Sequence, residues 1–242
     1  MLASNGSIAG TKAALDDYLF QQTGGVVQSG PFKGMKLLRE TAWKEARLAP
    51  QILGCYEEEL HGELEHQIKR LSALTNPVIG VVGSAEGYYP IGLKRRLPSA
   101  LAFAVDPDEK ANALCKQAAE FNGVGVDINP PVNLVMEEAS LLILDCEGHE
   151  VAYLDPERFP ALVEKHIIVE IHNVGDQKTD QILLDRFRGT HRINMVLEGP
   201  RNPNQYKELC ALSNDQRWLA VSENRPCLMA WFVMKPKGVV VK

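Results

Sequence analysis

The sequence predicts an α/β domain in which helices cover both faces of a mostly parallel sheet. After Asn76-Pro77, apolar runs of four to six residues recur with helix-like segments between most of them, the alternation typical of parallel βαβ units. Such apolar runs are expected of strands buried on both faces. The last quarter holds two further apolar runs with no complete helix expected between them, which predicts an antiparallel hairpin closing the sheet.

The expected strands account for most of the chain after residue 76. They lie at residues 78–82, 100–105, 123–128, 141–144, 167–171, 192–197 and 227–234. Before them, residues 1–30 show no clear pattern, and the glycines and proline of residues 30–38 indicate a turn or short hairpin.

Helices are expected from periodic apolar residues between the strands. The clearest begins at Pro107, a residue tolerated in a first helical turn, and ends near Phe121. A second is expected from Tyr56 to Leu74, where apolar residues recur along one stripe, and a third around residues 180–187.

Composition argues against several classes of function. The net charge is −5, so there is no general electrostatic reason to expect a nucleic-acid or anionic-membrane partner, and the basic run at residues 94–97 is interpreted as a solvated helix face. No segment approaches the roughly 18 consecutive apolar residues that span a bilayer, and the first residues lack a secretory pattern. Five cysteines without CxxC spacing suit a reducing compartment. We therefore expect a cytoplasmic protein without nucleic-acid or membrane partners.

Two motifs indicate a cofactor that contains a nucleoside. "GSAEGYY", residues 83–89, follows the first strand, and its glycines would let the backbone turn tightly beside a ligand. Asp106 ends the second strand, where a carboxylate can accept hydrogen bonds from both ribose hydroxyls. The alternatives are a turn without a ligand and a helix N-cap. Because GxGxxG and GxxxxGK[ST] are both absent, a dinucleotide or nucleoside triphosphate is disfavoured, and S-adenosylmethionine, which has no phosphate, fits better.

The fourth strand ends in a dense group of ionisable residues. In "LLILDCEGHEVAYLD", residues 141–155, four aliphatic residues are followed by Asp145, Glu147, His149 and Glu150 around Gly148. Ligands of doubly wound sheets bind beyond the carboxyl ends of the strands, so this tip is expected to face a cofactor and acceptor cleft.

These segments resemble the successive motifs of class I S-adenosylmethionine-dependent methyltransferases. The resemblance lies in "VVGSAEGYY", "FAVDPDEKANALC", "LLILDCEGHEVAYLD" and "IIVEIHN". The D-x-E-G-x-E run resembles the FkbM-like group in particular, as do "GPFKGMKL" and "LGCYEEEL" upstream. The resemblance implies a Rossmann-like, seven-stranded, mostly parallel sheet with an antiparallel last strand. It also implies a helical or irregular N-terminal lid, residues 1–75, on a cofactor-binding methyltransferase domain, residues 76–242.

By position, the same resemblance implies the residues that bind the cofactor. They are Gly83, Ser84, Ala85, Gly87, Tyr88, Asp106, Pro107, Asp127, Ile128 and Asp145. Tyr88 and Tyr89 would line the pocket or pack the following helix. One departure is Val81, which stands where many such enzymes have an acid. The contact to the methionine amino group must then be lost or supplied by Asp145, Glu86 or Tyr56-Glu57.

The expected reaction is methyl transfer to a small-molecule hydroxyl, in specialised metabolism or glycan tailoring. His172, just past the fifth strand, is the predicted general base, with His149 next, although either could be a structural polar residue. Asp145 and Glu147 complete the predicted catalytic set. Glu147 and Glu170 could orient an imidazole or the substrate.

Several alternatives stay open from sequence. Asp145, Glu170 and His172 could instead hold a divalent metal ion, as in metal-dependent O-methyltransferases. The acceptor atom could be nitrogen or carbon, or the chain could bind S-adenosylmethionine without catalysis. The oligomeric state is open, a homo-oligomer included.

Overall fold

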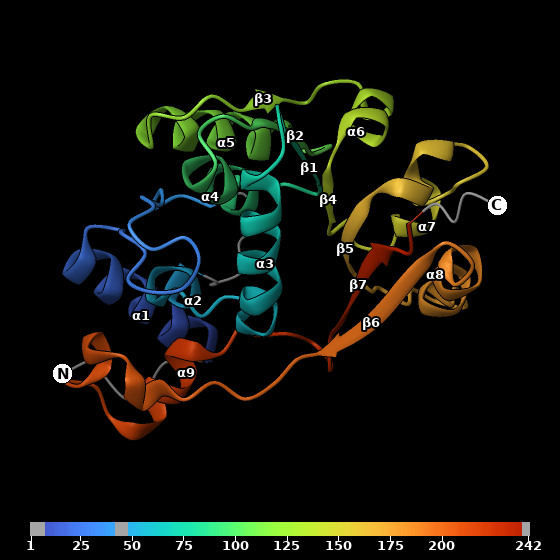
Figure 1. The fold of residues 1–242 in the computed structure, drawn as a ribbon. Helices are drawn as coiled ribbons and strands as arrows, with labels where there is room; N and C mark the ends of the chain where they lie inside the picture. The colour runs from blue at the N-terminus through green and yellow to red at the C-terminus, as the bar shows by residue number, and fades with distance from the viewer. Residues whose placement is uncertain (1–7, 42–47, 239–242) are drawn as a thin grey trace.

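The structure is a computed structural model that describes residues 8–41 and 48–238. Within them lies a seven-stranded sheet of order β3-β2-β1-β4-β5-β7-β6 (Figure 1). Its strands are β1 (Val78–Val82), β2 (Leu101–Val105), β3 (Asp127–Ile128), β4 (Leu141–Leu144), β5 (His166–Glu170), β6 (His191–Leu197) and β7 (Ala230–Pro236). Strands β1 to β5 pair in parallel, whereas β7 is antiparallel to both β5 and β6. The predicted Rossmann-like sheet with an antiparallel last strand is confirmed.

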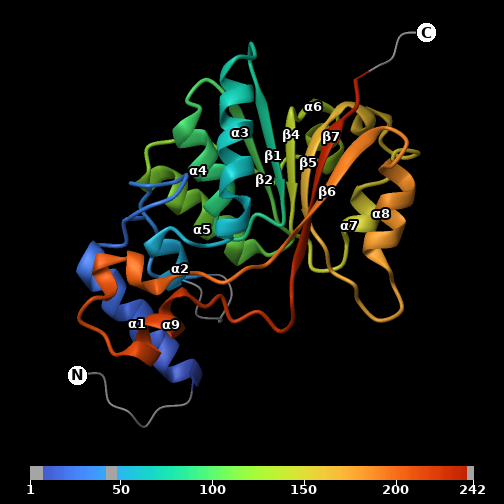
Figure 2. The same ribbon diagram turned by 60° about the horizontal axis from the view of Figure 1, so that its bottom comes forward.

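Helices cover both faces of the sheet (Figure 2). One face carries α3 (His61–Ser72), α4 (Tyr88–Arg96) and α5 (Glu109–Phe121), and the other carries α6 (Val132–Glu138), α7 (Glu150–Tyr153) and α8 (Thr179–Phe187). Alternate residues of a strand face opposite sides, so Ile79 and Val81 join one buried cluster while Val78 and Val82 join the other. Burial on both sides explains why these strands are apolar throughout.

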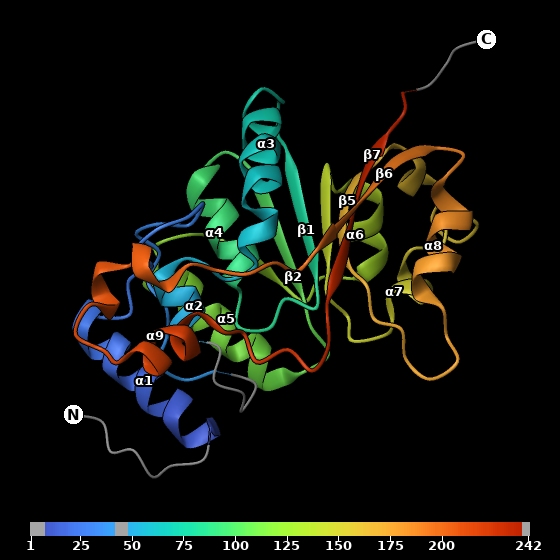
Figure 3. The same cartoon turned by 90° about the horizontal axis from the view of Figure 1, so that it is seen from below.

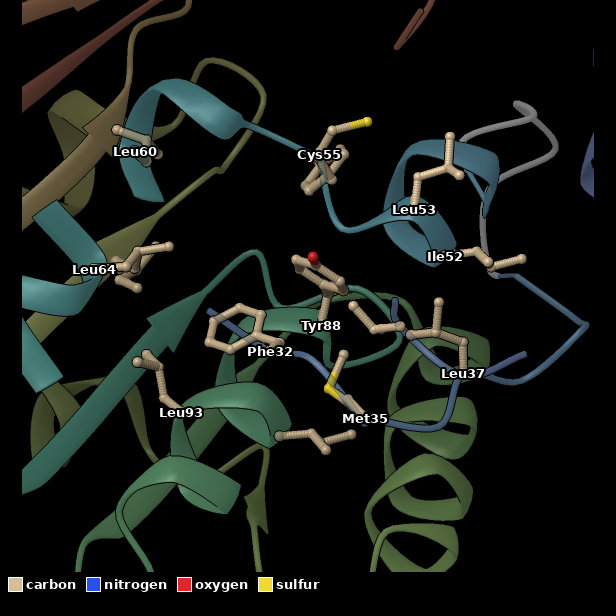
Figure 4. Packing of buried hydrophobic residues seen from close by; sticks show 14 of the residues in the cluster. Phe32, Met35, Leu37, Ile52, Leu53, Cys55, Leu60, Leu64, Tyr88 and Leu93 are labelled. Atoms are coloured by element: carbon tan, nitrogen blue, oxygen red, sulfur yellow. The ribbon is translucent and has the colours of Figure 1, made fainter. Parts of the chain in front are cut away.

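The N-terminal segment shares the core of one face. Phe32 and Met35 pack beside Tyr88 and Leu93 of α4 (Figure 4). The contact is close, since a Cβ atom on Gly92 of α4 would lie 2.4 Å from the Phe32 ring. This segment therefore packs as an integral part of the fold.

A third group of helices lies beyond the carboxyl ends of the strands (Figure 3). It comprises α1 (Ile8–Thr23), α2 (Leu48–Leu53) and α9 (Asn214–Val221), which contact one another. The buried Lys12 donates a hydrogen bond to the carbonyl of Ser222, and Asp16 accepts one at 2.7 Å from the amide of Ala49. The chain between β6 and β7 therefore returns to cover the N-terminal segment.

Two helical regions of the chain were not predicted. Residues 8–23 form α1. The sequence showed no helical pattern there because α1 buries polar Lys12 and Asp16 together with apolar Leu15 and Leu19. The expected loop between β6 and β7 contains α9 and two short 3-10 helices, η3 (Pro203–Gln205) and η4 (Lys207–Leu209).

Other differences concern the ends of elements. The helix expected from Tyr56 is η1 (Glu58–Leu60) followed by α3, and Leu74 lies beyond it, exposed. Helix α5 starts two residues after Pro107, with Asp108 as its N-cap, so the N-cap reading of Asp106 was wrong. A further 3-10 helix, η2 (Pro160–Glu164), precedes β5. None of the described helices is long and apolar enough to cross a bilayer.

Candidate active site at the strand tips

The glycine turn after β1 lies directly against the tip of β4. Gly83 has a left-handed φ of 80°, and a Cβ atom there would lie 1.6 Å from the carbonyl oxygen of Asp145. Only glycine allows this approach. The amides of Gly83 and Ser84 both donate to the carbonyl of Val105, at 2.8 and 3.1 Å, which ties the turn to the end of β2 as well.

Asp106 holds this turn in place. Its Oδ2 accepts a hydrogen bond from the amide of Ala85 at 2.9 Å, and its Oδ1 accepts one from the amide of Asp108, also at 2.9 Å. The residue is only 3% exposed. Both oxygens thus have a backbone partner, and the observed role of Asp106 is to join the glycine turn to the start of α5. Ribose binding by Asp106 stays a prediction.

The other residues predicted to bind the cofactor lie around the glycine turn and differ in their exposure to solvent. Pro107 and Asp127 are exposed, Ile128 is half-buried, and Ser84 is buried with its Oγ lacking a partner among the described residues. Tyr88 is buried in an aromatic cluster. Its ring contacts those of Phe32, Tyr56 and Tyr89 edge to face, with centroids 5.2, 5.3 and 5.7 Å away.

The chain reverses sharply after β4. Glu147 and Gly148 both have positive φ angles, 51° and 101°, and a Cβ atom on Gly148 would lie 2.8 Å from Val174. This reversal leaves Asp145 and Glu147 at the strand tip and places Glu150 at the start of α7, where it is fully buried.

His172 follows β5 and meets these acids. Its Nδ1 lies 2.8 Å from Oε1 of Glu150. Its Nε2 lies 3.8 Å from Oδ1 of Asp145 and 3.6 Å from Oε2 of Glu147, beyond hydrogen-bonding distance. Burial lowers the pKa of His172, but the hydrogen bond to Glu150 and the charges of Asp145, Glu150 and Glu147 outweigh it, so the pKa is raised above its usual value.

A second group of acids lies on the other side of Asp145. Carboxylate oxygens of Glu57, Asp145 and Glu170 all lie within 4.8 Å of one another. Arg225 pairs with Glu170 and, at 2.8 Å, with Glu57. Burial and the charge of Glu57 raise the pKa of Asp145 to about 7, against the opposing charge of His172. Burial and the charges of Asp145 and Glu57 likewise raise the pKa of Glu170, which Arg225 opposes.

Backbone strain is concentrated at this site. Outside glycine and asparagine, the described residues with positive φ are Glu57 (48°), Ala85 (44°) and Glu147 (51°). Side chains with a Cβ atom rarely adopt this conformation, which persists where the surrounding structure enforces it and is common at functional sites. All three residues belong to the segments that converge here.

The predicted residues are only partly brought together. Asp145, Glu147 and His172 meet, whereas Glu170 lies with Glu57 and Arg225, so the expected trio of Asp145, Glu170 and His172 does not form one group. His149, the second candidate base, is exposed at the N-cap of α7, with its Nδ1 3.1 Å from the carbonyl of Cys146.

Sequence reasoning missed two residues of the site, Arg225 and Glu223. Arg225 also donates to Glu223 through its Nε at 3.0 Å, and Glu223 accepts from the amide of Glu57 at 2.9 Å. Both follow α9, in the segment expected to be a plain loop. No local motif marks them as part of the site, because Glu57 and Glu170, the site residues with which they interact, lie more than 50 residues away along the chain.

In comparisons with known proteins, no family model and no curated protein sequence matches this chain. The FkbM-like assignment is therefore not confirmed. A solved structure with a similar fold is a human methyltransferase 10 domain containing protein, with a TM-score of 0.51, 11% identity, and coverage of 95% of this chain and 97% of that chain.

Two other similar structures have lower scores. One is an S-adenosylmethionine-dependent O-methyltransferase from Thermotoga maritima, with a TM-score of 0.48, 14% identity, and coverage of 72% of this chain and 64% of that chain. The other is a tRNA m1G37 methyltransferase from M. jannaschii, with a TM-score of 0.41, 16% identity, and coverage of 74% and 51%. The chain thus spans less than two thirds of the length of these two proteins. At 11% identity, the likeness to the human protein shows the fold alone, the Rossmann-like sheet described above.

Proposed function

We propose that the protein is an S-adenosylmethionine-dependent methyltransferase that acts on a hydroxyl group of a small molecule, with His172 as general base. The observation that carries this proposal is the position of His172. Its Nε2 has no hydrogen-bond partner among the described residues and lies beside Asp145, whose backbone packs on the glycine turn. A base at that point would stand next to the place where the fold binds a cofactor.

The residues present fit S-adenosylmethionine. The backbone around Gly83, Ser84, Ala85 and Gly87 would lie beneath the methionine and sugar portions, because this turn follows β1 at the carboxyl edge of the sheet, where such folds bind ligands. Asp106, Pro107, Tyr88, Asp127 and Ile128 would serve the ribose and adenine side. When bound, this cofactor supplies a methyl group on a positively charged sulfur.

The missing acid at Val81 has a candidate replacement. Oδ1 of Asp145 is buried and has no hydrogen-bond partner among the described residues, and a carboxylate oxygen of Glu57 lies within 4.8 Å of one of Asp145. Arg225 is shared among Glu57, Glu170 and Glu223, and Asp145 has no arginine or lysine partner among the described residues, so a further positive charge would be stabilised. We assign the methionine ammonium group to Asp145 and Glu57.

The protein's own part in the reaction is alignment and proton removal. Methyl transfer needs the acceptor held in line with the methyl group, which fixed groups at the strand tips favour. The hydroxyl must also lose its proton, and Nε2 of His172 would accept it. Asp145 and Glu147 would then stabilise the imidazolium, because both carboxylates lie within 4 Å of Nε2.

The acceptor side is assigned to the N-terminal segment. Of the expected lid, residues 1–75, helices α1 and α2 would cover the acceptor together with the segment around α9, whereas α3 packs on a face of the sheet. Residues 1–7 and 42–47 lie outside the described part. A small molecule in a reducing, cytoplasmic setting remains our proposal. The tRNA methyltransferase among the similar structures makes nucleic acid the acceptor class to test against it.

A divalent metal ion is the second candidate for the same position. Ligand atoms of Asp145, Glu147 and His172 lie within 4.8 Å of one another, and such carboxylate and imidazole groups can bind a cation. A metal ion there would occupy His172 and exclude its role as base. Chelation separates the two accounts: the base account predicts unchanged transfer after treatment with EDTA, and the metal account predicts loss that added Mg²⁺ or Mn²⁺ restores.

The test of the proposed function is methyl transfer from radiolabelled S-adenosylmethionine to a panel of hydroxyl compounds, with amines and tRNA in parallel. We expect His172→Ala to lower turnover on a hydroxyl acceptor by roughly 10²-fold with little change in cofactor affinity. His149→Ala is the matched control and should keep its turnover, since His149 is exposed and turned toward Cys146. Equal turnover in the wild type and His172→Ala would remove His172 from the mechanism.

A further inference from the structure

Glu150 is the most deeply buried acid next to the proposed base. It is 0% exposed, whereas the side chains of Asp145 and Glu147 are 28% and 61% exposed. A lone buried carboxylate is unfavourable, so it requires partners that stabilise its charge. Its place at the first turn of a four-residue helix does not by itself explain complete burial.

The partners of Glu150 come from both strand tips. Its Oε1 lies 2.8 Å from Nδ1 of His172 and accepts hydrogen bonds from the amides of Cys146 at 3.3 Å and Gly148 at 3.2 Å. Burial opposes ionisation, but the hydrogen bond with His172, the backbone hydrogen bonds from Glu150 and Gly148, and the charge of His172 together lower the pKa of Glu150 below its usual value. Oε1 of Glu150 already accepts from two backbone amides, so it is an acceptor for Nδ1, on the side of the imidazole opposite Nε2.

A charged carboxylate accepts hydrogen bonds and donates none. Nδ1 of His172 must therefore carry a hydrogen, which in the neutral ring leaves the lone pair on Nε2. The ring is also held through its backbone, because Oγ of Thr179 donates to the carbonyl of His172 at 2.6 Å. Both constraints direct Nε2 toward the space beside Asp145.

We infer that Glu150 is a positioning residue for the proposed base, fixing His172 in the Nδ1–H form with Nε2 directed at the acceptor. This inference rests on the proposed function. The arrangement is the carboxylate–imidazole pairing by which other enzymes set the tautomer of a base and stabilise its protonated form. The turn at residues 145–150 supplies this carboxylate, because Gly148 allows the reversal after β4 that lets Glu150 meet His172, just past β5.

Two substitutions separate positioning from structural support. Glu150→Gln keeps an oxygen that can accept from Nδ1 but removes the charge, and Glu150→Met keeps the length but removes the acceptor. We expect turnover to fall by about 10-fold in Glu150→Gln and by about 10²- to 10³-fold in Glu150→Met, with the dissociation constant for S-adenosylmethionine within about twofold of the wild type. Glu138→Gln, an exposed acid on α6, is the control and should change neither value.

The direct readout is the tautomer of His172 in ¹⁵N nuclear magnetic resonance, which needs no acceptor. We expect the Nδ1–H form in the wild type and in Glu150→Gln, and a shift to Nε2–H in Glu150→Met. An Nε2–H wild type, or a folded Glu150→Met variant with wild-type turnover, would overturn the inference. If Glu150→Met does not fold, the inference is still tested by the His172 tautomer of the wild type and by the turnover of Glu150→Gln. Failure of the wild type to bind S-adenosylmethionine would instead refute the proposed function and leave the tautomer unaffected.

Discussion

Gly83 is the residue on which the geometry of the strand tips depends most. Its left-handed backbone and its contact with the carbonyl of Asp145 leave no room for a side chain. Any displacement of that carbonyl moves the β4 tip, and Asp145 is the residue that contacts His172 on one side and Glu57 on the other. The turn and the acid cluster are therefore one structural unit.

Gly83→Ala should disrupt both stability and cofactor binding. Gly123→Ala is a matched control, because Gly123 also has a positive φ, 65°, but nothing lies within 4 Å of its Cβ position. We expect Gly123→Ala to cost about 1 kcal/mol of unfolding free energy from backbone strain alone. Gly83→Ala should cost at least ~2 kcal/mol more, since overpacking adds to the strain. Chemical denaturation measures both, and equal losses would show that the close contact is unimportant.

The sequence identified many residues of the candidate site but not their arrangement. Asp145, Glu147 and His172 were predicted because they end adjacent buried strands, and parallel strands bring their ends to one edge. Asp106 was predicted to bind ribose, but its carboxylate holds two backbone amides, a contact that depends on the exact path of the turn. Glu150 could not be assigned because its partner, His172, lies 22 residues along the chain.

At the scale of elements, Arg225 connects three separate parts of the chain. It pairs with Glu57 before η1, with Glu170 at the end of β5, and with Glu223 after α9. Its guanidinium group also lies 4.9 Å from the ring centroid of Trp231 in β7. The side chain is 8% exposed, so these pairs are shielded from solvent. Arg225 thereby joins the proposed lid to the sheet.

Arg225→Met should be strongly destabilising. Removing one partner from a buried ion-pair network leaves the others uncompensated, at a cost of roughly 3–5 kcal/mol. Arg188→Met is the control, because Arg188 pairs with Asp185 at 3.5 Å while both side chains are mostly exposed, and it should change stability by about 0.5 kcal/mol or less. Denaturant unfolding of the two variants provides the measurement. A similarly small change in the unfolding free energy of Arg225→Met and Arg188→Met would mean that the network contributes little to stability.

The same elements show where sequence patterns were sufficient. Strands β1, β4 and β5 were located nearly residue by residue, because burial on both faces produces unmistakable apolar runs. Helix α9 was missed, although Ser213 and Gln216 form a capping box that marks its start. Helix α1 gave a weaker sequence signal, because its buried residues include Lys12 and Asp16 and its sequence therefore lacks clear amphipathic periodicity.

At the scale of the whole molecule, the fold places a capped, acid-rich site at the carboxyl edge of the sheet. One face of the sheet shares its core with the N-terminal segment, and helices α1, α2 and α9 stand together beyond the strand ends (Figure 3). At this edge Asp145 and Glu147 have no arginine or lysine partner among the described residues, which favours a positively charged ligand. S-adenosylmethionine carries such charges on its sulfur and its ammonium group.

The central claim, that this site binds S-adenosylmethionine, is tested most directly by isothermal titration calorimetry of the purified protein with that cofactor. We expect saturable binding at a single site, weakened at least about 10-fold in Glu57→Gln because one of the carboxylates assigned to the ammonium group loses its charge. Glu138→Gln, on exposed α6, should bind as the wild type does. An absence of binding to the wild type at about 1 mM cofactor would contradict the account.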